Sequence, residues 1–381
     1  MDSGPLAGIR VLEVATGISG PYCGKLLADA GADVVKVEPA AGDPLRSWSA
    51  SGAPTSGRGA LFRFLNTSKR SVVGDLDTPA VDELAAAADL IIVDGGVEAG
   101  RIRELHAAHP GAVVVSLTPF GLTGPWPDAD LPTTEFVLQA ICGSTAWRGL
   151  RSTPPLQAGG RPGEWVTGVY GAAVGLAALR GARRDEREHS ERWGDLVDIS
   201  MFECMVVTMG GLTAVGAAVM GSRPAPRSLE LPSIEPTSDG LVGFCTITAQ
   251  QFQDFLILIE RPDLLADENL ATMPGRTARR EEFLAAVHAW TLKHTTDEII
   301  ESASALRIPV APIGAPDTVT SIDQFVARGA FIPHPDGTFQ QPRVPYRIGE
   351  FSGRALEPAP EVGADTGAVR WPPRREPPAS P

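Results

Sequence analysis

The first third of the chain alternates between short apolar runs and segments with the pattern of helices. Residues 9–14 alternate like a strand, a glycine-rich turn follows, and a helix to about Ala30 leads into a second strand at residues 33–37. This order is a βαβ unit, which requires a parallel sheet. It repeats, with strands expected at residues 71–73, 90–93 and 112–117 and helices at residues 79–88 and 101–109. The sequence therefore predicts an α/β fold whose ligands collect at the carboxyl ends of the strands.

The turn after the first strand bears on the choice of cofactor. An acid at the end of the second strand, here Glu38, is the residue type that holds a ribose in dinucleotide-binding folds. The glycines of the turn are Gly17, Gly20 and Gly24, however, and this spacing is not G-x-G-x-x-G. The pattern therefore disfavours nicotinamide binding.

A second feature is the uncharged stretch of residues 166–179, which predicts a helix buried on all sides. Pro162 and Gly163 mark its start, so that Glu164 falls in the first turn. Acids favour this position because the free N–H groups and the helix dipole stabilise a negative charge. A carboxylate fixed at the mouth of a buried helix is also a candidate nucleophile or base. Local chemistry leaves both interpretations open.

Glu135 opens another short helix, expected at residues 135–145. The polar segment of residues 180–193 reads as a surface loop, residues 196–200 as a strand and residues 201–220 as a mostly apolar helix.

The domain organisation follows from composition. A Pro-, Ser- and Arg-rich segment at residues 221–232 is the expected linker after a large domain of residues 1–220. A smaller α+β domain is expected at residues 233–325, with helices at 249–260, 279–290 and 296–306. Residues 326–381 are predicted to return to the large domain and to end in a flexible tail from about Trp371.

Charge and cysteine content exclude several classes of function. The net charge of −13 argues against a protein that binds nucleic acid or an anionic membrane surface. Cys23, Cys142, Cys204 and Cys245 are scattered without the spacing of a zinc site or a disulfide framework, and no basic-then-apolar signal precedes the first strand. These features favour a cytoplasmic protein without a metal. The apolar stretch of residues 204–222 is rich in Gly and Thr, so a core helix is favoured over a membrane span.

Several short motifs, in order along most of the chain, resemble the family III CoA-transferases, the group that includes formyl-CoA transferase, carnitine CoA-transferase and the 2-methylacyl-CoA racemases. The resemblance runs from Pro5 to about Thr366. The motifs that carry it lie at residues 5–13, 20–21, 27–39, 42–48, 66–71, 116–125, 198–202 and 236–240.

This resemblance implies a Rossmann-like large domain, a smaller domain and an interlocked homodimer. It also implies an enzyme that moves coenzyme A between an acyl-CoA and a carboxylic acid through a covalent intermediate on an enzyme carboxylate. The family's catalytic aspartate matches Glu164, which is a departure from the family. The His-Asp pair of the racemases matches Thr134 and Glu135, so only the acid is kept.

A set of residues that bind CoA is expected from the same resemblance and from the strand ends. The expected residues are Ile18, Ser19, Arg46, Lys69, Arg70, Gly95, Gly96, Arg103, Phe120 and Gly121. A second departure lies among them, because the family's Asn-Phe-Arg-Pro-Gly-like turn is replaced by residues 94–98, Asp-Gly-Gly-Val-Glu. Two acids beside an anionic cofactor are unexpected.

Two further hypotheses stay open. The first is a racemase or epimerase in which Glu135 and a second base, His106 or His109, move an α-proton of an acyl-CoA. The second is a family member that binds CoA without catalysis. The sequence does not identify the acyl group.

Overall fold

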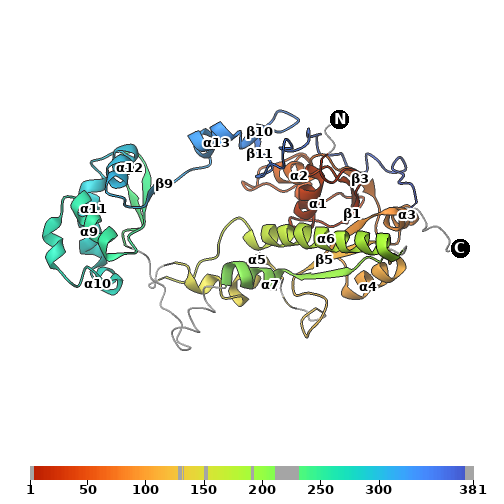
Figure 1. Cartoon of the computed structure of the whole chain (residues 1–381), viewed down its shortest axis with the longest axis horizontal. Helices are drawn as coiled ribbons and strands as arrows, with labels where there is room; N and C mark the ends of the chain where they lie inside the picture. The colour runs from red at the N-terminus through yellow and green to blue at the C-terminus, as the bar shows by residue number, and fades with distance from the viewer. Residues whose placement is uncertain are drawn as a thin grey trace. The chain divides into compact units, whose positions relative to one another are not determined.

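The structure is a computed structural model that describes residues 4–127, 131, 133–149, 153–189, 193–210 and 231–373. The chain divides into two compact units, each described here by itself (Figure 1). Unit 1 comprises Met1–Ala146, Gln157–Pro224 and Phe325–Pro381, and unit 2 comprises Trp147–Leu156 and Ala225–Gln324. Of the expected linker, residues 221–230 lie outside the described residues, as do residues 211–220 of the apolar helix and residues 374–381 of the tail.

The described part of unit 1 is built on a six-stranded sheet in the order β3-β2-β1-β4-β5-β6. Its strands are β1 (Arg10–Val14), β2 (Asp33–Glu38), β3 (Arg70–Val73), β4 (Leu90–Asp94), β5 (Val113–Thr118) and β6 (Leu196–Ser200). All neighbouring strands are parallel, and Leu12 of β1 pairs with both Val35 and Ile91. The prediction of an α/β fold is confirmed. The strand order reverses direction between β1 and β4, which is where ligands of such sheets bind.

Helices cover both faces of this sheet. Helices α1 (Ser19–Asp29) and α6 (Pro162–His189) pack on one face, in a core that includes Leu27 and Leu179. Helices α3 (Pro79–Ala87) and α4 (Ala99–Ala108) pack on the other, in a core that includes Leu84 and Ile102. The strands β4 and β5 read as nearly continuous apolar runs because both of their faces are buried.

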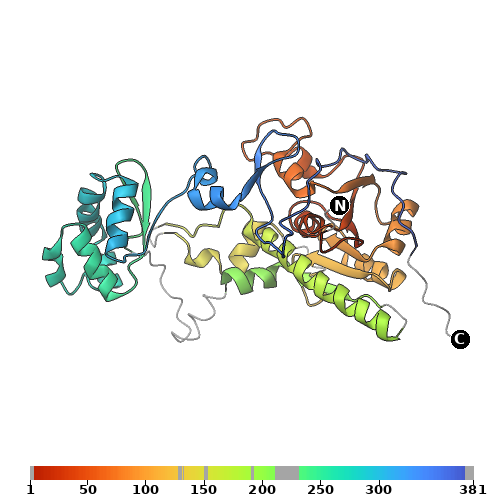
Figure 2. The ribbon, with the colours of Figure 1, turned by 45° about the horizontal axis from the view of Figure 1, so that its top comes forward.

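Helix α6 differs from the sequence prediction in two ways. It is not buried on all sides, because Val169 is 47% exposed and Val174 is 40% exposed. An uncharged helix is not a fully buried one when only one stripe of it packs on α1 and β5. It also continues to His189, where a loop was predicted from residue 180 (Figure 2). The polar segment is rich in Arg and Glu, which are strong helix formers, so its composition suits a helix as well as a loop.

Short elements complete unit 1. They are η1 (Pro44–Arg46), α2 (Ala60–Asn66), α5 (Glu135–Ile141), η2 (Thr145–Trp147), α7 (Met201–Met205), the π-helical turn η3 (Val206–Gly210), α13 (Asp323–Arg328), which spans the boundary between the units, and the hairpin of β10 (Phe331–Pro333) and β11 (Gln340–Pro342). Helix α5 ends before the predicted residue 145, since Gly143 turns to a φ of 82°.

The C-terminal segment lies along the edge strand β3. Asp365 donates its N–H to the carbonyl of Ser71 at 2.9 Å, and the Ser71 N–H donates to the Asp365 carboxylate at 2.9 Å. Val369 and Trp371 join the core beside α3 and α4. The segment therefore satisfies backbone groups that an open edge strand would leave unpaired.

Unit 2 contains a three-stranded antiparallel sheet of β7 (Ile234–Pro236), β8 (Leu241–Phe244) and β9 (Val310–Pro312). Its helices are η4 (Pro262–Ala266), α9 (Ala249–Leu258), α10 (Met273–Ala278), α11 (Arg280–Thr291) and α12 (Thr296–Ala305), and η5 (Val319–Ser321) follows the last strand. The three predicted helices are confirmed, and α9 and α12 begin with capping boxes at Thr248 and Thr295. Helix α10 was not predicted.

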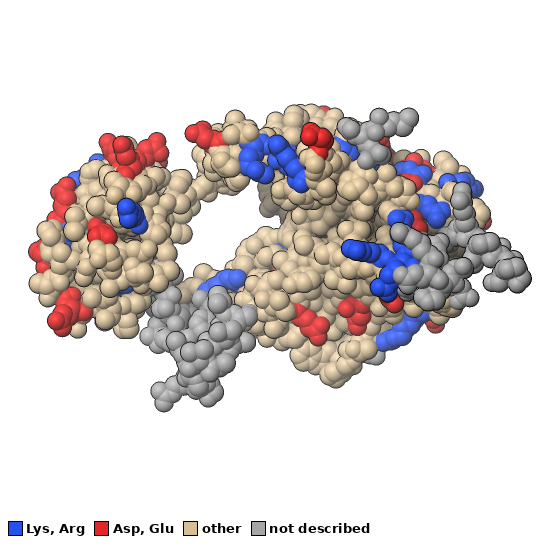
Figure 3. All heavy atoms as spheres, in the orientation of Figure 1, with Lys and Arg blue, Asp and Glu red and all other residues tan. Residues whose placement is uncertain are grey.

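The acidic composition extends over both units. On the face drawn in Figure 3, unit 2 shows more acidic than basic side chains, whereas unit 1 shows both kinds. No helix of the described residues combines the length and the apolar character needed to cross a bilayer.

Candidate active site

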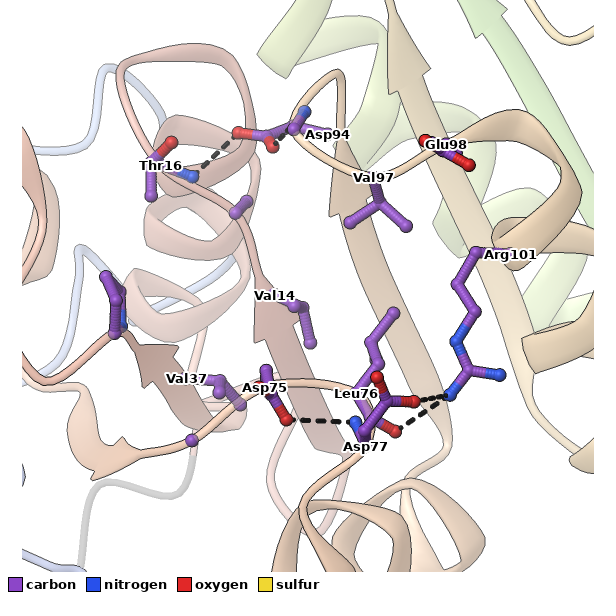
Figure 4. A pocket seen from close by; sticks show the side chains of 14 residues that line it. Val14, Thr16, Val37, Asp75, Leu76, Asp77, Asp94, Val97, Glu98 and Arg101 are labelled. Carbon is purple, nitrogen blue, oxygen red and sulfur yellow. Dashed lines mark hydrogen bonds and ion pairs between the residues drawn. The ribbon is translucent and has the colours of Figure 1, made fainter.

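The carboxyl ends of β1 to β4 surround a pocket of about 460 Å³ at the point where the strand order reverses (Figure 4). Val14, Val37, Leu76 and Val97 contribute apolar walls, and the polar lining comes from the turns that follow the four strands. An apolar pocket with a few polar groups at this position of a parallel sheet is the usual arrangement of a small-molecule site.

Asp94 ties together two of these turns. Its buried carboxylate accepts hydrogen bonds from the N–H of Thr16 at 2.7 Å and from the N–H of Gly96 at 3.2 Å. Burial raises the pKa of Asp94 to about 6, although the two N–H groups oppose the rise. Asp94 therefore fixes the turn before α1 against the turn after β4.

The predicted glycine-rich turns after β4 and β5 lie against each other. A Cβ on Gly95 would lie 3.0 Å from the ring of Pro119, so a larger residue would push the turns apart. Gly121 has a φ of 85°, and the next residue, Leu122, donates its N–H to Asp198 at 2.9 Å. Arg103 donates a hydrogen bond to the carbonyl of Leu122 and so stabilises the turn after β5.

Further aromatic contacts hold the turn after β5. The ring of Phe120 lies edge-on to Trp126, with 5.2 Å between centroids, and also contacts Phe202. Phe120 and Gly121 are therefore brought to the same edge as Gly95 and Gly96.

The N-termini of α1 and α6 lie side by side. A Cβ on Gly168 would lie 2.7 Å from the carbonyl oxygen of Ser19, so only glycine allows this close approach. No side chain caps α1 at Ile18. The first N–H groups of α1 therefore remain available to an anion near the start of α6.

Glu164 lies in the first turn of α6, as predicted, and is buried. Arg161 precedes the helix with a φ of 57° and pairs with the Glu164 carboxylate. Burial raises the pKa of Glu164, Arg161 lowers it, and the charges of Glu135 and Asp94 raise it, with a net rise above the ordinary value. A carboxylate with a raised pKa that is held by one cation is suited to covalent or acid–base chemistry.

Glu135 is next to this carboxylate. Its Oε1 accepts the N–H of Gly163 at 2.9 Å and the side-chain amide of Gln139 at 2.9 Å. Its Oε2 is buried without a hydrogen-bond partner among the described residues, and a Cβ on Gly163 would lie 2.9 Å from it. Glu135 therefore occupies the N-terminus of α6 and adds a like charge beside Glu164.

The other basic candidates are engaged by carboxylates. Arg46 is buried, holds Glu38 through two hydrogen bonds of 2.7 and 2.8 Å, and stacks on Phe62. Lys69 is buried against Glu13 at 2.7 Å, and burial lowers its pKa to about 8.

Arg70 begins β3 and pairs at 2.5 Å with Asp33, which begins β2. The amino ends of these strands form the opposite edge of the sheet. Arg46, Lys69 and Arg70 thus each pair with a carboxylate of the fold, and their expected contact with CoA stays a prediction.

The two histidine candidates also lie away from Glu135. His106 contacts the carbonyl of Gly194, and His109, next to the start of β5, contacts Asp82. Glu135 contacts the start of α6 at the carboxyl edge, so a strand length of roughly 17–20 Å separates it from them. Within one chain, neither histidine is placed to act with Glu135.

Arg161 and Asp198 were missed by sequence reasoning. The spacing of three residues between Arg161 and Glu164 was the available signal, because a basic residue just before a helix can reach an acid in its first turn. No local signal links Asp198 to Leu122, which is 76 residues away. The described residues contain no group of three or more His, Cys, Asp or Glu arranged to hold a metal ion.

Comparison with known proteins agrees with this geometry. The model of CoA-transferase family III matches residues 6–366. A succinate–glutarate CoA-transferase from Agrobacterium fabrum is 29% identical over 96% of this chain and 94% of its own length. A succinyl-CoA–D-citramalate CoA-transferase from Chloroflexus aurantiacus is 29% identical over 96% of this chain and 90% of its own. The crystal structure of a CAIB/BAIF family protein from Brucella suis is 26% identical, has a TM-score of 0.82, and covers 96% of this chain and 98% of that one. The chain therefore belongs to the CoA-transferase family III.

Proposed function

We propose that this CoA-transferase uses Glu164 as a nucleophile that carries CoA from a succinyl-type donor to a short dicarboxylic acid. CoA transfer between an acyl-CoA and a carboxylic acid is the activity of the family to which the chain belongs. The observation that supports the assignment to Glu164 is its burial at the start of α6, beside the N-terminus of α1. Its carboxylate pairs with Arg161, which is itself exposed to solvent.

The reaction proceeds by exchange of acyl bonds. The Glu164 carboxylate attacks the thioester carbonyl, the C–S bond breaks, and a mixed anhydride and a CoA thiolate form. The thiolate then attacks the glutamyl carbonyl of the anhydride and releases the donor acid, which leaves a glutamyl-CoA thioester. The acceptor carboxylate repeats these steps in reverse order. The enzyme carboxylate thus divides one difficult exchange into several easier steps.

The surroundings of Glu164 suit these steps. Each attack places negative charge on a carbonyl oxygen, and backbone N–H groups that are already oriented stabilise such charge. The start of α1 at Ile18 and Ser19 and the Gly95–Gly96 turn supply groups of this kind. Arg161 holds Glu164 in its ionised, nucleophilic form.

CoA is proposed to lie along the carboxyl edge of the sheet. Its thioester meets Glu164, and its nucleoside end occupies the pocket between β1 and β4. Phe120 and Gly121 of the turn after β5, and Arg103 of α4, then lie beside the part of CoA that joins its thioester to its nucleoside end. The relatives named above act on succinate, glutarate and citramalate, which are short dicarboxylic acids, and this supports acids of that class as substrates.

The test is formation of the intermediate. Incubation with succinyl-CoA and no acceptor should produce a glutamyl-CoA thioester that hydroxylamine traps, with a mass change on the peptide that contains Glu164. Glu164→Gln should abolish both the adduct and transfer, by a factor of roughly 10³ or more, because the amide does not attack. The same change at Glu203, an exposed residue in the first turn of α7, is the control. Full transfer by Glu164→Gln would exclude the covalent assignment.

We also propose a cytoplasmic, interlocked homodimer. The exposed apolar stripe of α6, which contains Val169, Ala173, Val174 and Ala177, supports an additional contact surface. Interlocked chains separate only after partial unfolding, so sedimentation should give a dimer at all dilutions. A folded monomer at high dilution would contradict this proposal.

A further inference from the structure

A buried glutamine on α5 joins this helix to the chain that enters α6. Gln139 is 0% exposed. Its amide oxygen accepts the N–H of Ala158 at 2.8 Å. Its amide nitrogen donates to the carbonyl of Ala158 at 3.0 Å and to Oε1 of Glu135 at 2.9 Å. These contacts use the acceptor and both donor hydrogens of the amide.

The contacts of Gln139 also determine which way its amide points. The Ala158 N–H requires an acceptor, so the amide oxygen faces it and the amide nitrogen faces Glu135. Oε1 of Glu135 accepts a second N–H, that of Gly163, at 2.9 Å. A continuous chain of hydrogen bonds therefore runs from Ala158 through the two side chains of α5 to the first turn of α6.

Glu164 is the next residue after this chain of hydrogen bonds. Oε2 of Glu135 has no hydrogen-bond partner among the described residues, so Oε1 alone holds the carboxylate. A Cβ on Gly163 would lie 2.9 Å from Oε2, so the carboxylate packs closely on the first turn of α6. Without the Gln139 amide, Glu135 keeps one hydrogen bond of two and is free to turn away from Gly163.

We propose that Gln139 is a positioning residue for CoA transfer: through Glu135 it fixes the first turn of α6, which carries Glu164. The inference rests on the proposed function, in which Glu164 is the nucleophile. A displacement of ~1 Å at a reacting oxygen can reduce the rate about 100-fold. Loss of the Gln139 amide should therefore lower kcat and leave the KM for succinyl-CoA nearly unchanged.

Replacing the amide by an acid of the same shape tests this role through pH. In Gln139→Glu, a protonated carboxyl accepts the Ala158 N–H and donates one hydrogen bond to Glu135. An ionised carboxyl has no hydrogen to donate and places a like charge beside Glu135. The kcat of Gln139→Glu should be within about threefold of that of the unmodified chain at pH 5.5 and roughly 30-fold lower at pH 8.5. Gln139→Leu makes no hydrogen bond and should lose a similar factor at both pH values.

Other titratable groups lie around α5 and enter the comparison equally. They are Glu135 and Cys142 of α5, Arg148 after it, Arg161 and Glu164 at the start of α6, Asp94 after β4, and Glu203 and Cys204 of α7. The unmodified chain carries all of them. The ratio of its kcat to that of Gln139→Glu at each pH therefore isolates the titration of the introduced carboxyl.

A matched control lies in unit 2. There the amide of Gln250 donates to Asp254 at 2.9 Å, also across four residues of a helix, but this pair is exposed. Gln250→Glu should leave kcat unchanged at both pH values, and urea midpoints at both show that each variant is folded.

Three results would overturn the inference: full kcat in Gln139→Leu, the same kcat ratio for Gln139→Glu at both pH values, or a change confined to KM. Transfer retained by Glu164→Gln would count against the proposed nucleophile alone, because the pH dependence of Gln139→Glu is measured independently of it.

Discussion

Two groups of charged side chains in unit 1 are compensated to very different degrees. Beneath α1, Glu13 contacts Lys36 at 3.1 Å and Lys69 at 2.7 Å, and Lys36 contacts Asp43 at 3.0 Å. The side chains of Glu13, Lys36, Lys69 and Asp43 are all 0% exposed. Burial lowers the pKa of Lys36, but the two carboxylates together raise it above its ordinary value. In this group, opposite charges are matched.

The second group lies at the carboxyl edge of the sheet and is not matched. The charges of Asp94 and Glu135 there raise the pKa of Glu164, and Arg161 pairs with Glu164. Within the described residues, no ion pair joins Asp94 or Glu135 to a cation. Since unmatched buried charge is destabilising, a fold keeps it where chemistry needs it. The matched group is expected to stabilise the fold, whereas the unmatched group contains the proposed nucleophile, Glu164.

The largest expected effect comes from breaking the matched group. Lys36→Met leaves Asp43 buried without its cation and removes one of the two partners of Glu13, which should destabilise unit 1 by about 3–5 kcal/mol. Urea unfolding followed by tryptophan fluorescence measures the change. Lys293→Met, at an exposed lysine, is the matched control. A midpoint for Lys36→Met equal to that of the control would show that the matched group does not stabilise the fold.

A smaller effect is expected from shortening the proposed nucleophile, Glu164, in the unmatched group. Glu164→Asp restores the residue usual in the family, but the site here is built around the longer side chain, whose carboxylate reaches Arg161. The aspartate should fall short by ~1 Å and reduce kcat roughly 100-fold without loss of stability. A turnover equal to or above that of the unmodified enzyme would show that the pocket still fits an aspartate.

Removing the cation of the unmatched group should change the pH dependence of transfer. Arg161 lowers the pKa of Glu164, so Arg161→Gln should raise that pKa and move the acid limb of the kcat/KM profile to higher pH. Transfer should fall roughly tenfold at pH 6 and less at pH 9, because the carboxylate is ionised at high pH in both forms. Arg180→Gln, farther along α6, is the control. An equal loss at both pH values would mean that Arg161 acts through structure and not through charge.

The sequence predicted the position of Glu164 well, because Pro162, Gly163 and the uncharged stretch after them are local signals for a helix start. The strands at residues 90–93 and 112–117 were equally clear, since strands buried on both faces are continuous apolar runs. The length of α6 was not predicted, because helix formers with charges resemble a polar loop in composition.

The basic residues show why the site was only partly predictable. Lys69 pairs with Glu13 across 56 residues of sequence, and Arg46 is held by Glu38 and by the carbonyl of Pro360. Nothing local separates a buried structural cation from one that contacts a phosphate. The ion pairs that these residues make are therefore revealed only by the tertiary structure, and their role in binding CoA stays a prediction.

The smallest expected effect concerns Asp94. It tests whether the charge of this carboxylate lowers the stability of unit 1. The pKa of Asp94 is about 6 in the folded chain and 3.8 ordinarily. Between these pH values the folded state holds a proton that the unfolded state has released, so stability falls as the pH rises and stays lower above pH 6.

The two pKa units correspond to a loss of about 3 kcal/mol of stability at neutral pH. Asp94→Asn recovers only part of this loss, because the asparagine amide does not accept the Gly96 N–H. Asp94→Asn should therefore stabilise unit 1 by about 1 kcal/mol at pH 7.5, and the gain should vanish or reverse at pH 4.5, where the folded aspartate is already neutral. Urea midpoints at the two pH values measure this difference. Equal destabilisation at both would mean that Asp94 is a structural hydrogen-bond acceptor, whereas a gain confined to neutral pH would show that the enzyme keeps a carboxylate beside Glu164 at the expense of stability.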